Sequence, residues 1–260
     1  MELAEELSHA RLVRVFGTVL LMGKAPALLM EPMRGGSLFD LLHNSRTAAV
    51  GSSAGAGTSG GAGSTVGGTV GAASPDHAVL TPPLQRRLVH EVAVGLCHLH
   101  EHGILHRDIK TANVLLDEAL HAKICDFGVA TRFSMQNGNG GEGRDLSRSV
   151  GTRRYMAPEV VFGAYGARAD IFAFGMLTFE VLHAAIPFAG HDGLVSLLRI
   201  QRGARPPIEL PPQLAGFALL ITSCWHQMPE RRPPSMATVV YMIEQCERTA
   251  AAREDPPCKV

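Results

Sequence analysis

Three short motifs hold the residues with the clearest chemical potential. In chain order they are His106-Arg107-Asp108-Ile109-Lys110-Thr111-Ala112-Asn113, Asp126-Phe127-Gly128 and Ala157-Pro158-Glu159. Asp108 offers a carboxylate that can accept a hydroxyl proton, and Lys110 places a cation two residues away. The oxygens of Asn113 and Asp126 are hard ligands of the kind that Mg²⁺ prefers. A lone Asp in a loop is usually a turn or cap residue, so the three motifs indicate a function only in combination.

These motifs match the patterns H-R-D-x-K-x-x-N, D-F-G and A-P-E, in the order and rough spacing that protein kinases have. The chain resembles a protein kinase catalytic domain over nearly its whole length, apart from one insertion and the extreme C-terminus. The resemblance implies that the γ-phosphate of ATP moves, with Mg²⁺, to a protein substrate. It makes Asp108, Lys110, Asn113 and Asp126 the catalytic residues. Asp108 would be the base, and Asn113 and Asp126 the metal ligands.

The same resemblance assigns an adenine site to the region before residue 44. Met30 stands where kinases carry the gatekeeper, and Glu31-Pro32-Met33 would be the hinge whose backbone groups meet adenine. Leu115 would lie beneath the ring. A core methionine, a strand end and a core leucine are the alternative interpretations of these positions. The implied ATP-binding residues are Met30, Glu31, Met33, Leu115 and Asp126.

Other positions would support the frame of the site. By resemblance, Arg107 pairs with a phosphorylated or acidic residue of the activation segment, and Glu159 pairs with Arg232 in a buried ion pair. Asp170 would hold the backbone of the catalytic loop, residues 106–113, from a buried helix. The implied regulatory and structural set is His106, Arg107, Phe127, Gly128, Thr152, Glu159, Asp170 and Arg232.

The resemblance also narrows the kinase group. Lys110 followed by Thr111-Ala112 is the serine/threonine form of the catalytic loop. Thr152 would contact Asp108 and Lys110 and so shape the site for a Ser or Thr substrate. Residues 151–156 resemble G-T-x-x-Y-M, and residues 224–233 resemble C-W-x-x-x-P-x-x-R-P. Both patterns are typical of the tyrosine-kinase-like group of serine/threonine kinases.

The start of the chain departs from the kinase pattern. If His9 matches the usual histidine after the glutamate-bearing helix of the N-lobe, that glutamate falls before Met1. We therefore expect a sequence truncated at its N-terminus that opens inside this helix. It would lack the first three strands, the glycine loop and the phosphate-binding lysine. Two alternatives stay open, namely a non-catalytic pseudokinase or scaffold that begins at Met1, and a tyrosine or dual-specificity kinase.

Hydrophobic patterns predict the elements that must position these residues. Before residue 44 the pattern is strand-like, and after the insertion it becomes helical. Thr81 can cap a helix that Gly103 ends, and the apolar stretch from Asp170 to His183 predicts a buried helix. The predicted strands are residues 12–16, 19–22, 27–30, 114–116 and 123–125, and a last helix follows Ser235. A small β part before a large helical part predicts an α+β fold with a partial kinase N-lobe and a complete, mainly helical C-lobe.

Composition sets the predicted boundaries. Residues 44–80 are rich in Gly, Ala and Ser and cannot bury enough apolar surface to offset their ordering entropy, which predicts a flexible insertion. The partial N-lobe, hinge and following helix would occupy residues 1–43. Residues 81–248 would form the C-lobe with the catalytic and activation loops, and residues 249–260 a C-terminal tail.

Charge and cysteine content limit the partners and the compartment. The 24 basic and 24 acidic residues balance, so no net field favours nucleic acid or an anionic membrane. The five cysteines form no C-x-x-C pair, which favours a reducing cytoplasmic (intracellular) compartment. No apolar stretch reaches the ~18–20 residues of a membrane span. Four histidines, His98, His100, His102 and His106, lie close in sequence, but no partner set for a metal is evident.

Overall fold

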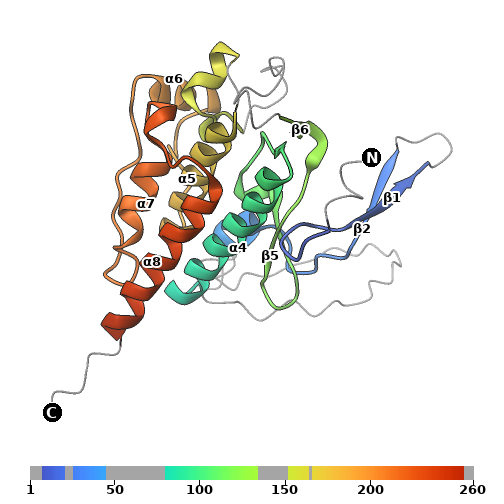
Figure 1. The fold of residues 1–260 in the computed structure, drawn as a ribbon, viewed down its shortest axis with the longest axis horizontal. Coiled ribbons are helices and arrows are strands. Elements are labelled where there is room, and N and C mark those ends of the chain that lie inside the picture. The colour runs from blue at the N-terminus through green and yellow to red at the C-terminus, as the bar shows by residue number, and fades with distance from the viewer. Residues whose placement is uncertain (1–7, 21–25, 45–79, 134–151, 164–165, 255–260) are drawn as a thin grey trace, which may run out of the picture.

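The computed structural model describes residues 8–20, 26–44, 80–133, 152–163 and 166–254, without the side chains of Thr152 and of residues 251–254. Figure 1 shows a helical body from which a two-stranded hairpin projects. The helix expected before His9, the last two residues of the strand expected over 19–22 and nearly all of the 44–80 insertion lie outside the described residues.

The described elements confirm an α+β fold with a mainly helical C-terminal part. The helices are α2 (Leu38–His43), α4 (Pro82–Glu101), α5 (Ala167–His183), α6 (Gly193–Gln201), α7 (Phe217–Cys224) and α8 (Met236–Glu254). The strands form three antiparallel pairs: β1 (Val15–Val19) with β2 (Ala27–Met30), β3 (Ile104–Leu105) with β6 (Thr131–Arg132), and β4 (Val114–Leu116) with β5 (Ala122–Ile124). Short 3₁₀ turns are η1 (Thr111–Asn113), η2 (Phe127–Val129), η4 (Thr152–Tyr155), η5 (Pro158–Phe162) and η6 (Pro229–Arg231).

The first strand differs from the prediction. A strand was expected over residues 12–16 and another from Val19, but a single strand, β1, occupies Val15–Val19. Leu12 lies outside that strand and makes an isolated parallel bridge to Ile124 of β5. The apolar run therefore serves two different sheets, and its alternation could not show where one pairing ends and the next begins.

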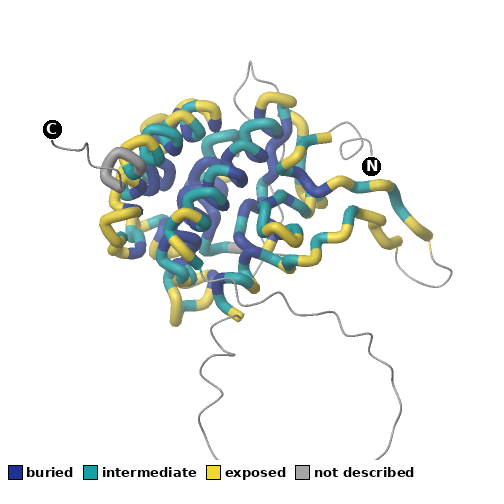
Figure 2. Tube along the Cα trace, turned by 90° about the horizontal axis from the view of Figure 1, so that it is seen from below, coloured by how far each residue is buried: buried dark blue, intermediate teal, exposed yellow. Residues whose placement is uncertain are grey.

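The hairpin of β1 and β2 stands apart from the core. Phe16 is 53% exposed, Leu28 58% and Leu29 53%, and Figure 2 shows both strands of the hairpin extending beyond the buried body. The hairpin therefore draws little stability from the hydrophobic burial that holds the helices together.

Helix α4 follows the local signals in its sequence. The Thr81 side chain accepts a hydrogen bond from the Leu84 amide at 3.4 Å, and two prolines occupy the first turn. Beyond the helix, Gly103 takes a left-handed φ of +68°, which a glycine adopts without strain. The apolar face of α4 is buried, which confirms the helix predicted between Thr81 and Gly103.

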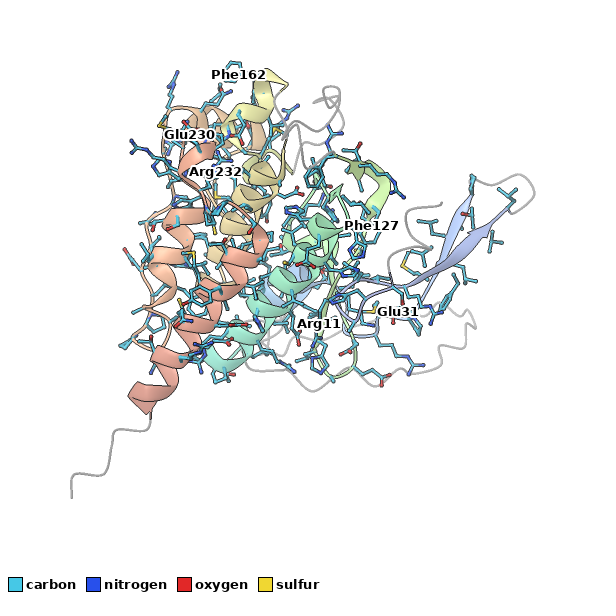
Figure 3. The ribbon with its side chains drawn as sticks, in the orientation of Figure 1. Arg11, Glu31, Phe127, Phe162, Glu230 and Arg232 are labelled. Carbon is cyan, nitrogen blue, oxygen red and sulfur yellow. The ribbon has the colours of Figure 1, made fainter. Side chains whose placement is uncertain are left out.

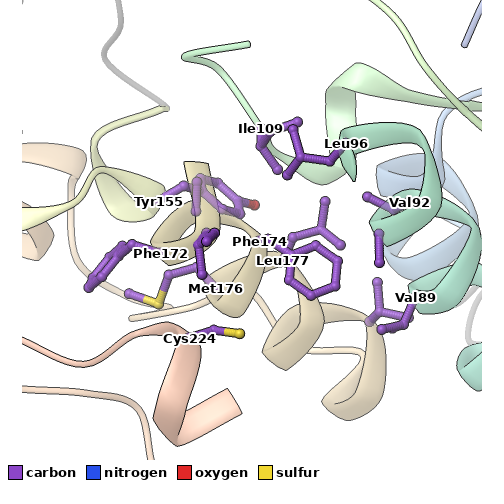
Figure 4. Close-up of a cluster of buried hydrophobic side chains, with 14 of the residues drawn as sticks. Val89, Val92, Leu96, Ile109, Tyr155, Phe172, Phe174, Met176, Leu177 and Cys224 are labelled. Atoms are coloured by element: carbon purple, nitrogen blue, oxygen red, sulfur yellow. The ribbon is translucent and has the colours of Figure 1, made fainter. Parts of the chain in front are cut away.

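Helix α5 is the centre of the core. Every residue from Ala169 to Leu182 is buried, because α4 packs against one side of the helix and α7 against another. Figure 4 shows Phe174 and Leu177 of α5 directed toward Val89 and Val92 of α4. The buried helix predicted over Asp170–His183 is confirmed, with its start three residues earlier.

The last helix extends beyond residue 248. The Ser235 hydroxyl accepts a hydrogen bond from the Thr238 amide at 3.3 Å, and α8 then continues to Glu254, past the expected end of the lobe at residue 248. Within the described ranges, no helix is both long enough and apolar enough to cross a membrane.

Gly175 sets how closely α5 and α7 can approach. A Cβ atom at this position would lie 2.9 Å from the Cys224 Cβ and 3.1 Å from the Trp225 amide nitrogen. We expect Gly175→Ala to lower the free energy of unfolding by about 1–3 kcal/mol, because backbone atoms must move to admit the methyl group. Urea unfolding measures this change.

The control is Gly216→Ala. Gly216 already has a helical φ of −60°, and a Cβ there would meet no atom closer than 3.8 Å. Equal stability losses in the two variants would show that the contact between α5 and α7 does not restrict residue 175.

Candidate active site

Asp170, in the first turn of α5, holds the catalytic loop. Its carboxylate is fully buried and accepts hydrogen bonds from the backbone amides of His106 and Arg107, both at 2.9 Å. Nε2 of His100, near the end of α4, lies 3.0 Å from the same carboxylate. Arg107 has a left-handed φ of +67°, which costs a non-glycine residue about 1–2 kcal/mol. The two hydrogen bonds from the backbone amides to the Asp170 carboxylate offset this strain.

Asp108, Lys110 and Asn113 come together at the end of this loop. Lys110 Nζ lies 2.8 Å from Asp108 Oδ2, and the Asn113 side-chain nitrogen donates to the same oxygen at 3.1 Å. Asn113 also donates to the Asp108 carbonyl at 2.9 Å. Asp108 and Asn113 are each only 7% exposed. The arrangement holds one carboxylate in a single orientation beside a cation.

His106 connects the catalytic loop to the Asp126-Phe127-Gly128 motif. Nδ1 of this buried ring accepts a hydrogen bond from the Asp108 amide at 3.2 Å, so Nε2 carries the proton and faces the Cys125 carbonyl at 2.9 Å. Burial lowers the pKa of His106, although nearby carboxylates led by Asp170 act in the opposite direction. The ring is therefore neutral at physiological pH, and its edge packs against Phe127.

Asp126 begins a tight turn two residues after β5. It has a left-handed φ of +64°, and its carboxylate accepts a hydrogen bond from the Gly128 amide at 3.3 Å. The Asn113 carbonyl accepts a hydrogen bond from the Cys125 amide at 2.9 Å, so the backbone of Asn113 is paired with the residue just before Asp126. The Asn113 amide nitrogen is engaged by Asp108, which leaves the amide oxygen as the atom that suits a cation. The Asn113 amide oxygen and the exposed Asp126 carboxylate are oxygen ligands that fit a divalent cation such as Mg²⁺.

The hinge residues lie where the hairpin joins the body. Met30 is the last residue of β2 and is 39% exposed, so it is not a core methionine. After the hinge, the Gly35 amide donates to the Leu116 carbonyl and the Leu116 amide donates to the Gly36 carbonyl, each at 2.9 Å. These bonds hold the hinge, including the half-buried Met33, near the β4–β5 ribbon that carries Leu115.

Glu31 ties this hinge to the ribbon through a contact that the sequence analysis missed. Its carboxylate accepts a hydrogen bond from the Arg14 amide at 2.8 Å and pairs with Lys123 of β5 at 2.8 Å. Partial burial acts to raise the pKa of Glu31, but the bonds from Lys123 and the Arg14 amide lower it overall. Figure 3 shows Glu31 and Phe127 on the side of the body from which the hairpin extends.

Glu180 of α5 is a second missed residue. Its fully buried carboxylate accepts a hydrogen bond from the Tyr155 hydroxyl and lies 2.8 Å from Nε2 of His43 in α2. Burial raises the pKa of Tyr155, with the Glu180 carboxylate as the next cause. The sequence signal that could have identified Glu180 is a charged residue within a helix that is otherwise apolar nearly all round.

Glu159 and Arg232 form the ion pair implied by the resemblance. Two guanidinium nitrogens lie 2.6 and 2.8 Å from the two carboxylate oxygens, and Arg232 is only 2% exposed. The guanidinium carbons of Arg232 and Arg205 each lie 4.9 Å from the centre of the Phe172 ring. Figure 3 shows Arg232 within the helical body, remote from the hinge. The pair is therefore part of the frame and lies away from the reacting groups.

Two implied contacts fall where the structure gives no description. The part of the activation segment expected to supply the partner of Arg107 falls within residues 134–151, which lie outside the described residues. Thr152 begins η4, but its side chain is not described. The roles of Arg107 and Thr152 therefore stay predictions.

Arg232 allows a sharp test of the frame. We expect Arg232→Met to lower the free energy of unfolding by about 3–5 kcal/mol, since it leaves the Glu159 carboxylate and several backbone carbonyls without their donor. Arg248→Met is the control. Arg248 is exposed and pairs with Glu244 at 3.5 Å on the surface of α8, so its loss should change stability by less than about 0.5 kcal/mol. Similar losses in both variants, measured by urea unfolding, would contradict a structural role for the buried pair.

Asp170→Asn tests the support of the catalytic loop. Asparagine keeps one carbonyl oxygen but presents an NH₂ group where an amide or His100 needs an acceptor. We expect a stability loss of about 1–3 kcal/mol and faster hydrogen exchange at the His106 and Arg107 amides. Unchanged exchange at these two amides would show that another group holds the loop.

Comparison with known proteins agrees with this geometry. The model of the "Protein kinase domain" family matches residues 1–242. A probable serine/threonine-protein kinase of Dictyostelium discoideum is 30% identical over 253 residues, which cover 94% of this chain and 23% of that protein. Receptor-interacting serine/threonine-protein kinase 3 of Rattus norvegicus is 39% identical over 193 residues, covering 65% of this chain and 38% of that protein.

A third relative shows that named specificities vary. Dual specificity protein kinase pyk3 of Dictyostelium discoideum is 29% identical over 227 residues, which cover 86% of this chain and 14% of that protein. The chain thus spans well under half the length of each of these relatives. The family match, over most of the chain and across all three motifs, shows that this chain belongs to the protein kinase domain family.

Proposed function

We propose that this chain is the catalytic part of a serine/threonine-protein kinase of the tyrosine-kinase-like group. The observation that carries the proposal is the Asp108 carboxylate, held by Lys110 at 2.8 Å and by Asn113 at 3.1 Å. A carboxylate oriented in this way beside a cation is suited to accept a proton from a hydroxyl group. The acceptor would be a Ser or Thr hydroxyl of a protein.

The proposed reaction is transfer of the γ-phosphate of ATP. The substrate oxygen forms a bond to the γ-phosphorus while the bond from that phosphorus to the bridging oxygen of ADP breaks. Asp108 accepts the hydroxyl proton, and Lys110 supplies positive charge next to it. When Mg²⁺ is bound by Asn113 and Asp126, it neutralises phosphate charge. The neutral His106 ring keeps the two loops that carry these groups in register.

The adenine ring would bind between the hinge and the β4–β5 ribbon. The backbone bonds that join Gly35 and Gly36 to Leu116 support this placement, because they bring the hinge beside Leu115. Met30, Glu31 and Met33 would then line the other side of the ring. We also propose a cytoplasmic location, which the free thiols of Cys97, Cys125, Cys224 and Cys246 support.

Serine/threonine specificity rests on the catalytic-loop sequence and on the names of two relatives. Lys110 is present in the described loop, and the relatives from Rattus norvegicus and Dictyostelium discoideum are named as serine/threonine kinases. The dual-specificity relative makes tyrosine phosphorylation the second candidate. A scaffold without catalysis is the third.

Asp108→Asn tests the proposed reaction. We expect the rate of phosphate transfer to a protein substrate to fall by about 10²–10⁴-fold, because the variant cannot accept the hydroxyl proton. Mg·ATP affinity, measured by calorimetry, should stay unchanged, whereas Asp126→Asn should weaken it. The control is Asp192→Asn, since Asp192 caps α6 outside the site and asparagine caps equally well.

Each outcome selects one candidate. Phosphoserine or phosphothreonine in the product supports the proposal, and phosphotyrosine selects the dual-specificity alternative. A folded wild-type chain that neither binds Mg·ATP nor transfers phosphate selects the scaffold. Equal transfer rates for Asp108→Asn and Asp192→Asn would remove Asp108 from the reaction.

A further inference from the structure

Three histidine rings form a column where the N-terminal segment meets α4. The ring of His9 stacks on the ring of His98 with centroids 4.4 Å apart and planes 14° from parallel. The ring of His98 in turn contacts the ring of His102, one helical turn further along α4, at 4.1 Å. The site described above uses none of these rings.

The hydrogen bonds of the column require a neutral His9. The backbone amide of Arg11 donates to Nδ1 of His9 at 3.1 Å, so this nitrogen presents its lone pair and cannot carry a proton. Protonation at Nδ1 would place two N–H groups against each other. It would also place a cation face to face with His98.

Charged groups around the column act in both directions. Burial lowers the pKa of His9, followed by the charge of Arg11, while Glu101 acts to raise it and His102 to lower it. Burial also lowers the pKa of His98, with His9 and His102 as further causes and Glu101 again in opposition. Glu101 accepts a hydrogen bond from Cys97 at 3.5 Å, and the Arg11 guanidinium is held by Glu91 at 3.0 Å. Among the groups that shift the pKa of His9 and His98, Glu101 is thus the carboxylate that raises both values.

The sign of the pH effect follows from these directions. A histidine whose pKa is lowered in the folded chain stabilises its contacts fully above the ordinary value of about 6.5. That contribution is lost as the pH falls through the lowered value. The neutral rings of His9 and His98 therefore contribute to holding the segment, and acid weakens that contribution.

The column adjoins the segment that docks the N-terminal part onto the body. The Ile124 amide donates to the Arg11 carbonyl and the Val13 amide donates to the Ile124 carbonyl, both at 2.9 Å. Gly95 permits the close approach to α4, since a Cβ there would lie 2.8 Å from the Arg11 carbonyl oxygen. Figure 3 shows Arg11 beside α4. Ile124 stands two residues before Asp126, so the docked segment directly supports the backbone that leads to the candidate metal ligand.

We propose that His9 and His98, packed against His102, form an acid-sensitive clasp, and that protonation of His9 or His98 weakens the docking of residues 9–13 on α4 and β5 while the buried side chains of Leu12 and Val13 keep the segment attached. Weaker docking makes the two backbone bonds to Ile124 open more often and loosens the strand that leads into Asp126. The clasp concerns docking of a segment and holds whether or not the chain transfers phosphate.

Hydrogen exchange at the Val13 and Ile124 amides tests the clasp in the 260-residue chain. When the pH is lowered from about 7.5 to about 5, the protection factors of these amides, corrected for intrinsic exchange, should fall about fivefold. This factor corresponds to the repulsion between two like charges about 4 Å apart in water. His9→Phe keeps a ring against His98, and His9→Asn keeps an acceptor for the Arg11 amide, but neither titrates in this range. In both variants the acid-induced loss at these amides should fall below about twofold.

The control is His191→Phe, because His191 lies outside the column and should leave the wild-type loss unchanged. Urea unfolding at about pH 8, where His9 and His98 are neutral, verifies that each variant is folded. His106 is present in every variant, so any contribution that it makes to the pH dependence is the same in all of them. The proposal is overturned if the wild-type chain loses no protection in acid, if both His9 variants lose as much as wild type, or if His191→Phe also abolishes the loss.

Discussion

The buried carboxylate of Asp170 is the constraint on which the candidate site depends. It lies at the start of a helix packed on several sides and accepts the amides of His106 and Arg107, which hold the left-handed backbone at Arg107. Without these bonds the loop would relax toward ordinary dihedral angles, and Asp108 would no longer meet Lys110 and Asn113. The rigidity of the hydrophobic core thus reaches the reacting groups through one side chain.

Helix α5 repeats this principle with a second buried carboxylate. Glu180 receives the Tyr155 hydroxyl and lies against His43, so it joins the segment before Ala157-Pro158-Glu159 to the helix after the hinge. Buried charges are costly unless fully partnered, and both carboxylates have more than one partner. The apolar helix therefore carries two polar anchors, one for the catalytic loop and one for the segment around Tyr155 and the end of α2.

The N-terminal part is attached in a different way. The hairpin itself buries little apolar surface. Its connection to the body combines the buried side chains of Leu12 and Val13 with polar contacts: Glu31 with Lys123, Arg11 with Glu91, and the histidine column. Polar contacts of partly exposed groups respond to pH and salt far more than hydrophobic burial does. These polar contacts make the attachment of the hairpin more sensitive to pH and salt than the apolar interior of the helical body.

The sequence by itself determined the family, the motif residues and the helices whose signals are local. Thr81 and Gly103 mark the two ends of α4 through local signals, namely a side-chain cap and a left-handed glycine. The apolar composition of residues 170–183 was enough to predict a buried helix. Only the tertiary structure showed that Leu12 pairs with β5, that Lys123 meets Glu31, and that His9 stacks on His98. Each of these contacts joins residues about 90 or more positions apart, and local propensity contains no information on which distant groups the packing brings together.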